Sequence, residues 1–420
     1  MSRKGTAARA EEAQTLPAGW RWVRLGEVCE LNPRRPALDR SDDRPTSFVP
    51  MTAVDEVRGV IAKPELKRFA EVKKGYTYFT EGDVLFAKIT PCMQNGKHAI
   101  ARDLIDHIGF GSTEFHVISP GVHVSSEWVH LYVRQRFVLD DATAHFTGAV
   151  GQQRVPDSYL ASLEIPLPPL PEQKRIAAIL NGQLAAVDNA RAAAEAQLEA
   201  AKALPAAYLR RVFPKPGEKL PQGWRWVQLG EMSDLLPSKS IASDGDAEVQ
   251  AITTACLTET GFSPLGIKPA RMWSADAPLC VVAAGEVLIA RSNTPDLVGR
   301  AAMFEGTQAE VVASDLTIRI RTNCRLEPGY LTSYLSSIFI KGYWKEASGG
   351  ASGTMKKITR TQVAALSVPL PPLDEQRRIT GQIAEKMTRA RNAQAVFEDQ
   401  LHDINALPAA LLRRAFSGEL

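Results

Sequence analysis

The sequence lacks the features that would place it in several common protein classes. No apolar run approaches the length of a membrane-spanning helix, and the start, MSRKGTAARAEEAQT, has basic residues but no apolar stretch like that of a secretory signal. The five cysteines are odd in number and form no CxxC pair, which argues against a disulfide framework or a zinc site. We therefore expect a cytoplasmic protein of a reducing compartment, with residues 1–15 as a disordered tail.

Familiar catalytic motifs are missing as well. The sequence contains no Walker pattern, no Gly-rich dinucleotide loop after a strand, no HExxH and no NPPY- or DPPY-like methyltransferase motif. Six histidines lie between residues 98 and 145, but no paired cysteines or carboxylates accompany them at metal-ligand spacing. We therefore predict no catalytic and no metal-binding residues in this chain. A catalytic site of an unrecognised type stays open as an alternative.

What the chain has instead is a long internal repeat. Residues 16–31 and 220–235 are identical at 11 of 16 positions. The block IPLPPLPEQKRI at 165–176 returns as VPLPPLDEQRRI at 368–379, and ALPAAYLRRVF at 203–213 returns as ALPAALLRRAF at 406–416. The offset is 203 or 204 residues in each case. Three separated blocks at one offset predict a duplicated unit, large enough in each copy to be a domain with its own core.

The two copies differ in their interiors. Residues 32–160 and 237–360 match only in traces, such as GDVLFAKITPCMQNGKHA at 82–99 and GEVLIARSNTPDLVGRAA at 285–302. Strand patterns around these traces, and helical spacing of apolar residues over Ser125–Asp141 and Pro328–Glu346, predict one mixed α/β domain in each copy. One framework with two different interiors suits a protein that reads two different things in one geometry.

Each PLPPL block is followed by a long helical pattern. Its apolar residues recur at spacings of three, four or seven, which predicts a coiled-coil stripe, and the simplest partner for each stripe is the other. The predicted helix-pairing residues are Ile176, Leu180, Val187 and Leu198 on the first helix, packed on Ile379, Ile383, Phe397 and Leu401 of the second. Pro205 and Pro408 are expected to interrupt the helices, each of which would restart as a short terminal helix.

The sequence thus predicts an α+β protein with two similar mixed α/β domains, joined by two long antiparallel coiled-coil helices, and an internal pseudo-twofold repeat. Phe213 and Phe416 are equivalent, so we expect Ser417–Leu420 to lie near the start of the first repeat, around Leu16. Helices of about 30 residues span about 45 Å, and half-sites one turn of duplex DNA apart are separated by about 34–36 Å. The net charge of +3 permits DNA binding without requiring it.

At these motifs the chain resembles the specificity (S) subunits of type I restriction-modification systems. The doubled PLPPL-x-EQ blocks, the GW-x-W-x-x-L-G-E openings, the GDVL strand and the Gly-rich segment before PLPPL are similar to that family over residues 16–420. The resemblance implies target-recognition domains at 16–170 and 214–371, with a central spacer helix at 171–213 and a C-terminal one at 372–420. It implies a non-catalytic, sequence-specific DNA-binding subunit whose two domains each read half of a bipartite, asymmetric site.

The resemblance also implies partners. These are double-stranded DNA, two methyltransferase (modification) subunits docked on the helices and the restriction (motor-nuclease) subunits, with no membrane. S-adenosylmethionine is expected in the methyltransferase subunits, and no cofactor is expected in this chain. The alternative is a coiled-coil adaptor that binds proteins only, without DNA specificity.

Candidate DNA contacts lie where the divergent interiors meet the shared frame. Loops on a rigid scaffold commonly carry recognition, and glycine lets a backbone approach a ligand closely. Polar residues end the GDVL strand and its counterpart or follow them, and the Gly-rich segments 147–154 and 348–357 end in cations. The predicted DNA-binding residues are Lys88, Thr90, Lys97, Gln153 and Arg154 in the first copy, and Arg291, Asn293, Thr294, Arg300, Lys356 and Lys357 in the second.

Overall fold

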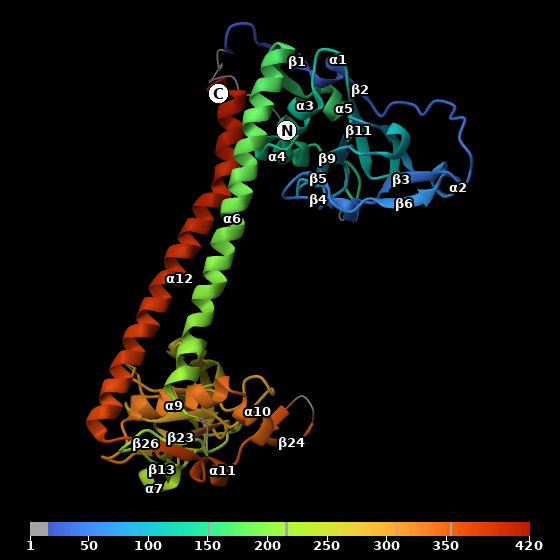
Figure 1. The fold of residues 1–420 in the computed structure, drawn as a ribbon. Coiled ribbons are helices and arrows are strands. Elements are labelled where there is room, and N and C mark those ends of the chain that lie inside the picture. Colours follow the sequence, from blue (N-terminus) through green and yellow to red (C-terminus); the bar gives the residue numbers. More distant parts are fainter. Residues whose placement is uncertain (1–15, 150–151, 215–216, 308, 353–354) are drawn as a thin grey trace. The chain divides into compact units, whose positions relative to one another are not determined.

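The chain divides into two compact units that share two long helices. Figure 1 shows the computed structural model, which describes residues 16–149, 152–214, 217–307, 309–352 and 355–420. The tail expected at 1–15 lies outside the described residues. The first unit comprises residues 1–194 and 400–420, and the second comprises residues 195–399. The last residues of the chain therefore belong to the first unit, which is the relationship that the repeat predicts.

Two four-stranded sheets, one antiparallel and one mixed, form the body of the first unit. One four-stranded sheet has the order β2-β11-β8-β9 and the other β6-β3-β10-β7, in which only β3 and β10 run parallel. Two-stranded antiparallel pairs join β1 to β12 and β4 to β5. The strands are β1 Arg21–Arg24, β2 Cys29–Leu31, β3 Pro45–Val49, β4 Val54–Asp55, β5 Val60–Ile61, β6 Glu65–Arg68, β7 Thr77–Thr80, β8 Val84–Ala87, β9 His98–Ile100, β10 Ile108–Gly111, β11 Phe115–Pro120 and β12 Glu164–Leu167.

The second unit repeats this plan with changes. Its four-stranded sheet β14-β23-β19-β21 corresponds to β2-β11-β8-β9, and β18-β15-β22, β20-β25-β24, β13-β26 and β16-β17 complete it. The strands are β13 Arg225–Gln228, β14 Ser233–Leu236, β15 Ala247–Ile252, β16 Leu257–Thr258, β17 Gly261–Phe262, β18 Ile267–Met272, β19 Val287–Ala290, β20 Ser292–Asn293, β21 Ala301–Met303, β22 Val312–Ala313, β23 Thr317–Thr322, β24 Gly349–Ser352, β25 Met355–Lys357 and β26 Ser367–Leu370.

Short helices cover the sheets and close the connections. In the first unit they are α1 Leu25–Val28, α2 Phe69–Val72, α3 Ser126–Val133, α4 Arg136–Ala144 and α5 Asp157–Ser162. In the second unit they are α7 Leu229–Met232, α8 Ala277–Cys280, α9 Pro328–Ile340, α10 Tyr343–Ala347 and α11 Arg360–Ala364. Single 3₁₀ turns lie at Met51–Ala53, Ile105–His107, Thr254–Cys256 and Pro264–Gly266.

The GDVL block forms the central strand that the pattern predicts. All four residues of β8 and all four of β19 are buried, as expected for an uninterrupted apolar run inside a sheet. Gly82 and Gly285 precede these strands with φ of 88° and 87°, a conformation that favours glycine. The shared sequence therefore fixes both the strand and the turn that enters it.

The two expected helices of the interiors are each broken into two. The pattern predicted one helix over Ser125–Asp141, but α3 ends at Val133 and α4 begins at Arg136. At the break, Arg134 donates hydrogen bonds to the carbonyl oxygens of residues 56, 57 and 58, at 3.2, 2.6 and 3.1 Å. In the second unit, Gly342 with φ of 80° separates α9 from α10. Tertiary contacts and one glycine thus override the helical periodicity.

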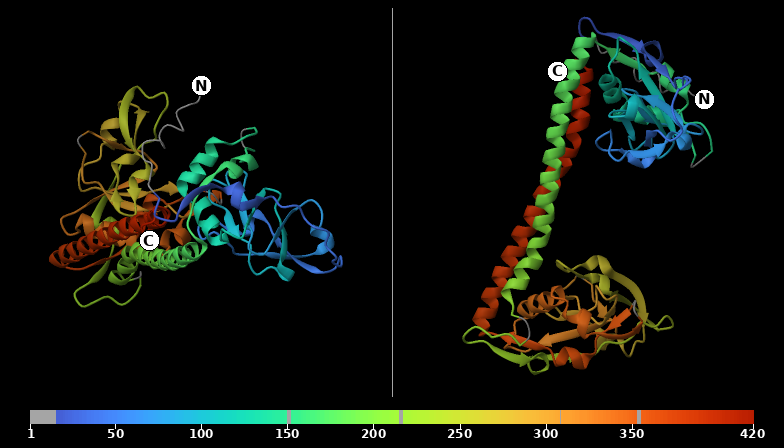
Figure 2. Two further views of the ribbon diagram at one scale, coloured as in Figure 1. Left: turned by 90° about the horizontal axis from the view of Figure 1, so that it is seen from above. Right: turned by 45° about the vertical axis from the view of Figure 1, so that its right-hand side comes forward.

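The long helices α6, Leu170–Val212, and α12, Leu373–Phe416, run antiparallel wherever they meet within a unit (Figures 1 and 2). In the first unit Arg191 Nε donates to Asn405 Oδ1 at 2.8 Å, and in the second Gln394 Nε2 donates to the Ala201 carbonyl at 3.2 Å. Pro205 and Pro408 do not interrupt them, so that expectation is wrong. The turns beyond each proline end on buried aromatic rings, Phe213 and Phe416, and this packing offsets the backbone hydrogen bond that proline removes.

The C-terminus closes onto the first unit as expected. A Cβ atom added to Gly418 would lie 2.1 Å from Pro17 Cγ, so the end of the chain touches its described beginning. Ala415 and Phe416 belong to the core of this unit together with Trp128 and Leu180. The counterpart Phe213 lies in the core of the second unit with Tyr330 and Tyr334. Each unit thus buries the end of a long helix in its core, and in the first unit that end comes from a distant part of the sequence.

Candidate nucleic-acid interface

The loop after β8 is paired with the end of the Gly-rich segment in the first unit. Ile89 and Arg154 form an antiparallel bridge. The Thr90 amide donates to the Gln153 carbonyl at 3.1 Å, and the Val155 amide donates to the Lys88 carbonyl at 2.9 Å. Lys88 and Thr90 are therefore brought beside Gln153 and Arg154, which stand about sixty residues later in the sequence.

The second unit makes the same pairing at the equivalent positions. Strand β20 pairs with β25, with Ser292 opposite Lys357 and Asn293 opposite Lys356. The Ile358 amide donates to the Arg291 carbonyl at 2.9 Å. Each of these positions lies 203 residues after its counterpart in the first unit. The structure thus brings together the predicted residues of the strand end and of the Gly-rich segment in both copies, although residues 150–151 and 353–354 of these segments lie outside the described residues.

An ion pair organises the paired segments of the first unit. Arg154 Nε donates to Glu114 Oε2 at 2.8 Å and Nη2 donates to Oε1 at 2.7 Å, while Nη1 donates to the Gln152 carbonyl at 3.0 Å. The hydrogen bonds from Arg154 lower the pKa of the Glu114 carboxyl, and the charges of Arg154 and Lys88 add to this. Glu114 is therefore an ionised partner of Arg154 at neutral pH, and the sequence analysis did not identify it.

In the second unit the predicted polar residues are less constrained by partners. Thr294 and Lys357 are exposed, and Asn293 Oδ1 accepts a hydrogen bond from the Thr294 amide at 2.8 Å. Arg291 Nη1 donates to the Asp315 carbonyl at 3.2 Å, and Lys356 Nζ approaches the Ser348 carbonyl at 3.5 Å. These side chains line the same paired segments and present hydroxyl, amide and ammonium groups.

Lys97 and Arg300 have partners of a different kind. Lys97 Nζ donates to the Val54 carbonyl at 3.0 Å and lies 3.8 Å from Glu56 Oε2. Arg300 Nη2 contacts Glu259 Oε1 at 3.1 Å, and its guanidinium lies 5.4 Å from the centre of the Phe339 ring. Their side chains are only 20% and 22% exposed. Each cation is thus directed to the small hairpin of its own unit, β4–β5 or β16–β17.

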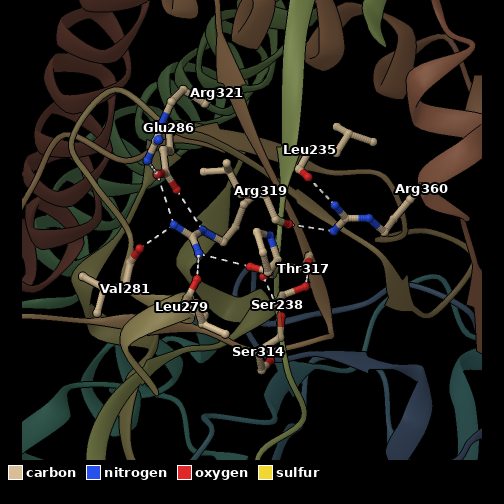
Figure 3. A network of polar contacts seen from close by, with 12 residues as sticks. Leu235, Ser238, Leu279, Val281, Glu286, Ser314, Thr317, Arg319, Arg321 and Arg360 are labelled. Atoms are coloured by element: carbon tan, nitrogen blue, oxygen red, sulfur yellow. Dashed lines mark hydrogen bonds and ion pairs between the residues drawn. The ribbon is translucent and has the colours of Figure 1, made fainter. Parts of the chain in front are cut away.

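A buried ion pair lies at the centre of a polar network in the second unit (Figure 3). Arg319 on β23 binds Glu286 with distances of 2.9 and 3.1 Å, and both side chains are at most 3% exposed. Arg319 also donates to the carbonyl oxygens of residues 237, 279 and 281. On the same strand Thr317 Oγ1 donates to the Ser314 carbonyl at 3.0 Å, which fixes the loop that Arg291 contacts. This network holds the loops of the second unit at fixed positions.

The predicted helix-pairing residues are buried in most cases, and the two nearest the start of each helix pack into a domain core instead. Ile176 and Leu180 lie in the core of the first unit with Trp128, and Ile379 and Ile383 lie in the core of the second with Tyr330. The expected packing of the first pair on the second is therefore corrected. Val187 and Leu198 are also buried, whereas Phe397 and Leu401 are half-buried. The first turns of both long helices are therefore part of the domain cores.

The glutamine of each PLPPL-x-EQ block is a residue whose role the sequence analysis missed. Gln173 is fully buried; its Oε1 accepts from the Ser125 amide at 2.9 Å, and its Nε2 donates to the carbonyls of residues 123 and 168, both at 2.9 Å. Gln376 is also fully buried; its Oε1 accepts from the Glu327 amide at 2.8 Å, and its Nε2 donates to the carbonyls of residues 325 and 371 at 2.9 and 3.0 Å. The repetition of the block was a signal, but the partners could not be read from it.

Two searches of the described ranges bear on other kinds of site. No group of three or more His, Cys, Asp or Glu side chains in these ranges is placed to hold a metal ion. Among the helices described, none is long and apolar enough to cross a membrane.

Comparisons with known proteins point in one direction. The family model described as type I restriction modification DNA specificity domain matches residues 17–200. The specificity subunit of the type I restriction enzyme EcoEI from Escherichia coli is 38% identical over 167 residues, which cover 40% of this chain and 28% of that protein. The chain thus spans about a quarter of the length of this curated relative.

Solved structures cover far more of the chain. The crystal structure of the HsdS subunit from Thermoanaerobacter tengcongensis is 27% identical, with a TM-score of 0.69 over 98% of this chain and 100% of that one. A chain from a structure that describes complex assembly and conformational transition of the type I R-M system is also 27% identical. Its TM-score is 0.75 over 97% of this chain and 100% of that one. Both likenesses extend through the two units and both long helices.

Proposed function

We propose that this chain is a specificity subunit of a type I restriction-modification system, and that each of its two units reads one half of a bipartite, asymmetric DNA site; its similarity to such subunits supports this. The target-recognition domains are assigned to 16–170 and 214–371, and the spacer helices to 171–213 and 372–420. The helices set the spacing between half-sites and dock two methyltransferase subunits, which bind S-adenosylmethionine. Restriction subunits complete the complex, and this chain contributes sequence recognition rather than catalysis.

One observation carries the proposal. The pairing of Ile89 with Arg154 recurs as the pairing of Ser292 with Lys357, so the two units present equivalent segments. The side chains on these segments differ between the copies, with Arg154 and Glu114 in one and Lys357 and Thr317 in the other. One geometry with two sets of polar groups suits the reading of two different base sequences.

Selection of binding sites from a random duplex library tests this function directly. The full chain, with its methyltransferase partner, is expected to enrich two short motifs separated by an unread spacer, with an affinity that falls as salt rises. Replacing 32–160 with the corresponding segment of a relative should change one motif and leave the other motif and the spacing alone. A protein-only adaptor would instead enrich no sequence at all.

The spacing function has its own test. Inserting four residues after Ala193 adds about 6 Å and about 40° of rotation to α6. The added length corresponds to one or two base pairs at about 3.4 Å each. We expect the preferred spacer to change, or recognition to be lost, while the preferred bases stay the same. Unchanged spacing with full affinity would show that α6 is not the ruler.

A further inference from the structure

The Glu114–Arg154 ion pair uses only some of the N–H donors of the arginine, and the remaining donors point in a fixed direction. A guanidinium group carries five N–H donors. Two of those of Arg154 go to Glu114, through Nε and Nη2, and one from Nη1 goes to the Gln152 carbonyl. One N–H therefore remains on each of the two terminal nitrogens. The side chain is 41% exposed and that of Glu114 is 25% exposed, so the free end of the guanidinium can be reached from solvent.

Both members of the pair stand on a fixed backbone. The Arg154 amide donates a hydrogen bond to the Thr147 carbonyl, and the Arg154 carbonyl accepts one from the Thr147 amide, both at 2.9 Å. Arg154 also forms an antiparallel β-bridge with Ile89. The Glu114 carbonyl accepts from the Lys88 amide at 2.9 Å, and its amide donates to Ser112 Oγ at 3.2 Å. The guanidinium plane is thus oriented before any ligand arrives, which reduces the conformational entropy lost on binding.

The charge of the pair distinguishes between two possible ligands. A phosphate contact draws on positive charge and needs little orientation, and a carboxylate beside the arginine would weaken it by repulsion. A base edge is uncharged but requires donors in a set direction. Guanine presents two acceptors, N7 and O6, in the major groove, whereas adenine presents one acceptor and one donor. A fork that offers only donors matches guanine.

We propose that Arg154, with Glu114 as its positioning residue, reads a guanine in the half-site bound by the first unit. This inference rests on the proposed function of the chain and names one base contact within it. The second unit provides an internal control. Its counterparts of Arg154 and Glu114, each 203 residues later, are Lys357 and Thr317, which cannot form this fork. The arginine-based guanine contact is therefore a property of the first half-site only.

Site selection with the full chain and its methyltransferase partner tests the inference through three variants. Arg154→Ala and Arg154→Lys are expected to lose the preference at one guanine by about tenfold or more, with the rest of both half-sites kept. Glu114→Gln, which retains the shape but removes the charge, should weaken the same preference while leaving the other positions alone. Lys357→Ala is the matched control, because it changes the equivalent position of the other unit and should leave the first half-site intact.

A modified base gives a readout that a merely structural role would not move. Replacing the identified guanine by 7-deazaguanine removes N7 and should reduce wild-type affinity by about fivefold or more. The same replacement should have no further effect on the Arg154→Ala variant, because the contact is already gone. Melting curves of each variant, expected to match the wild type, establish that the chain remains folded.

The outcomes separate the inference from the function on which it rests. A uniform loss of affinity in Arg154→Ala, with the guanine preference unchanged, overturns the base contact and leaves the specificity function standing. The same is true if 7-deazaguanine weakens the wild type and the Arg154→Ala variant equally. A wild-type chain that enriches no bipartite sequence overturns both.

Discussion

Gln173 and Gln376 make the same three hydrogen bonds in the two repeats, from side chains with no exposed surface. Each accepts from the amide that precedes a domain helix and donates to two carbonyls, one of them in the PLPPL block. The first turn of each long helix is thereby attached to its domain. The spacing role that we propose for the long helices requires rigidly held ends, and these glutamines supply that attachment.

Replacing either glutamine should destabilise the chain. Gln173→Ala leaves one buried amide and two carbonyls without that partner, so we expect a loss of about 3 kcal/mol in the free energy of unfolding. Gln376→Ala should cost a similar amount. Gln197→Ala, at an exposed position of the same helix α6, is the control and should change stability by less than about 0.5 kcal/mol in urea denaturation. A loss as small as that of the control would exclude an anchoring role.

The buried pair of Glu286 and Arg319 gives a second prediction (Figure 3). Arg319→Met removes the buried partner and leaves the Glu286 carboxylate with the half-exposed Arg321 alone, whose Nη2 lies 2.8 Å from Oε1. We therefore expect a loss of about 3 kcal/mol, at the lower end of the range for breaking a buried pair. Replacing both residues, with Arg319→Met and Glu286→Leu together, should recover part of that loss. Lys345→Met is the control, because its pair with Asp296 at 2.7 Å is exposed and contributes less than about 1 kcal/mol. If the stability lost in the double variant equalled the sum of the losses in the two single variants, Arg319 and Glu286 would not be energetically coupled.

Two buried histidines make the first unit sensitive to acid. The His98 ring stacks on Phe86 with centres 4.1 Å apart, and His130 Nε2 donates to the His98 carbonyl at 3.1 Å. Burial lowers the pKa of His130 to about 3 and that of His98 well below its usual value, and the charge of Arg134 adds to both shifts. The stability that these neutral rings provide is complete above about pH 6.5 and is lost as the pH falls towards 3.

From pH 7.5 to 5.5 we therefore expect each histidine to reduce the free energy of unfolding by about 1 kcal/mol, measured by urea denaturation. His130→Gln should be less stable at neutral pH but should show a smaller dependence on pH. His402→Gln, at an exposed position, should retain the wild-type dependence. An unchanged slope in His130→Gln would show that other groups titrate in this range.

Features that depend on residues close together in the sequence could be predicted, whereas features that depend on contacts between distant segments could not. The burial of Ile176 and Leu180 follows from spacing along one helix, and the buried strand at 84–87 follows from its apolar run. The Glu114–Arg154 pair joins segments 40 residues apart through a fold that no local pattern reveals. The helix break at Arg134 likewise depends on carbonyls of residues 56–58.

The candidate site shows the same division. Repetition at one offset indicated which segments carry the variable groups, and the structure pairs those segments with each other. Repetition could not tell that Lys97 and Arg300 are held by hairpins, because their acidic partners stand 41 residues earlier in each copy. The predicted helix break at Pro205 was wrong. The hydrogen bond that a proline removes can be read from the local sequence, whereas the packing of Phe213 in the domain core, which offsets that loss, depends on distant residues.

The last prediction concerns a fragment that ends at Phe213. The first unit is completed by residues 400–420, where Phe416 packs on Trp128 and Tyr132 with ring centres 4.4 and 5.1 Å apart. The fragment 1–213 lacks this segment but carries its counterpart, ALPAAYLRRVF. In the second unit Phe213 packs on Tyr330 and Tyr334 in the same manner, at 5.4 and 5.6 Å.

Phe213 of one fragment can therefore occupy the place of Phe416 in the core of a second fragment, and the second fragment can do the same in the first. We expect fragment 1–213 to form a dimer with true twofold symmetry that engages methyltransferase subunits and reads a palindromic site made of the first half-site twice. Mass in solution and the methylation pattern measure this. Phe213→Ala should weaken the dimer by about tenfold or more, since a large buried ring is lost, whereas Arg210→Ala, at an exposed position, should not. A well-folded monomer, or methylation of the original asymmetric site, would rule the exchange out.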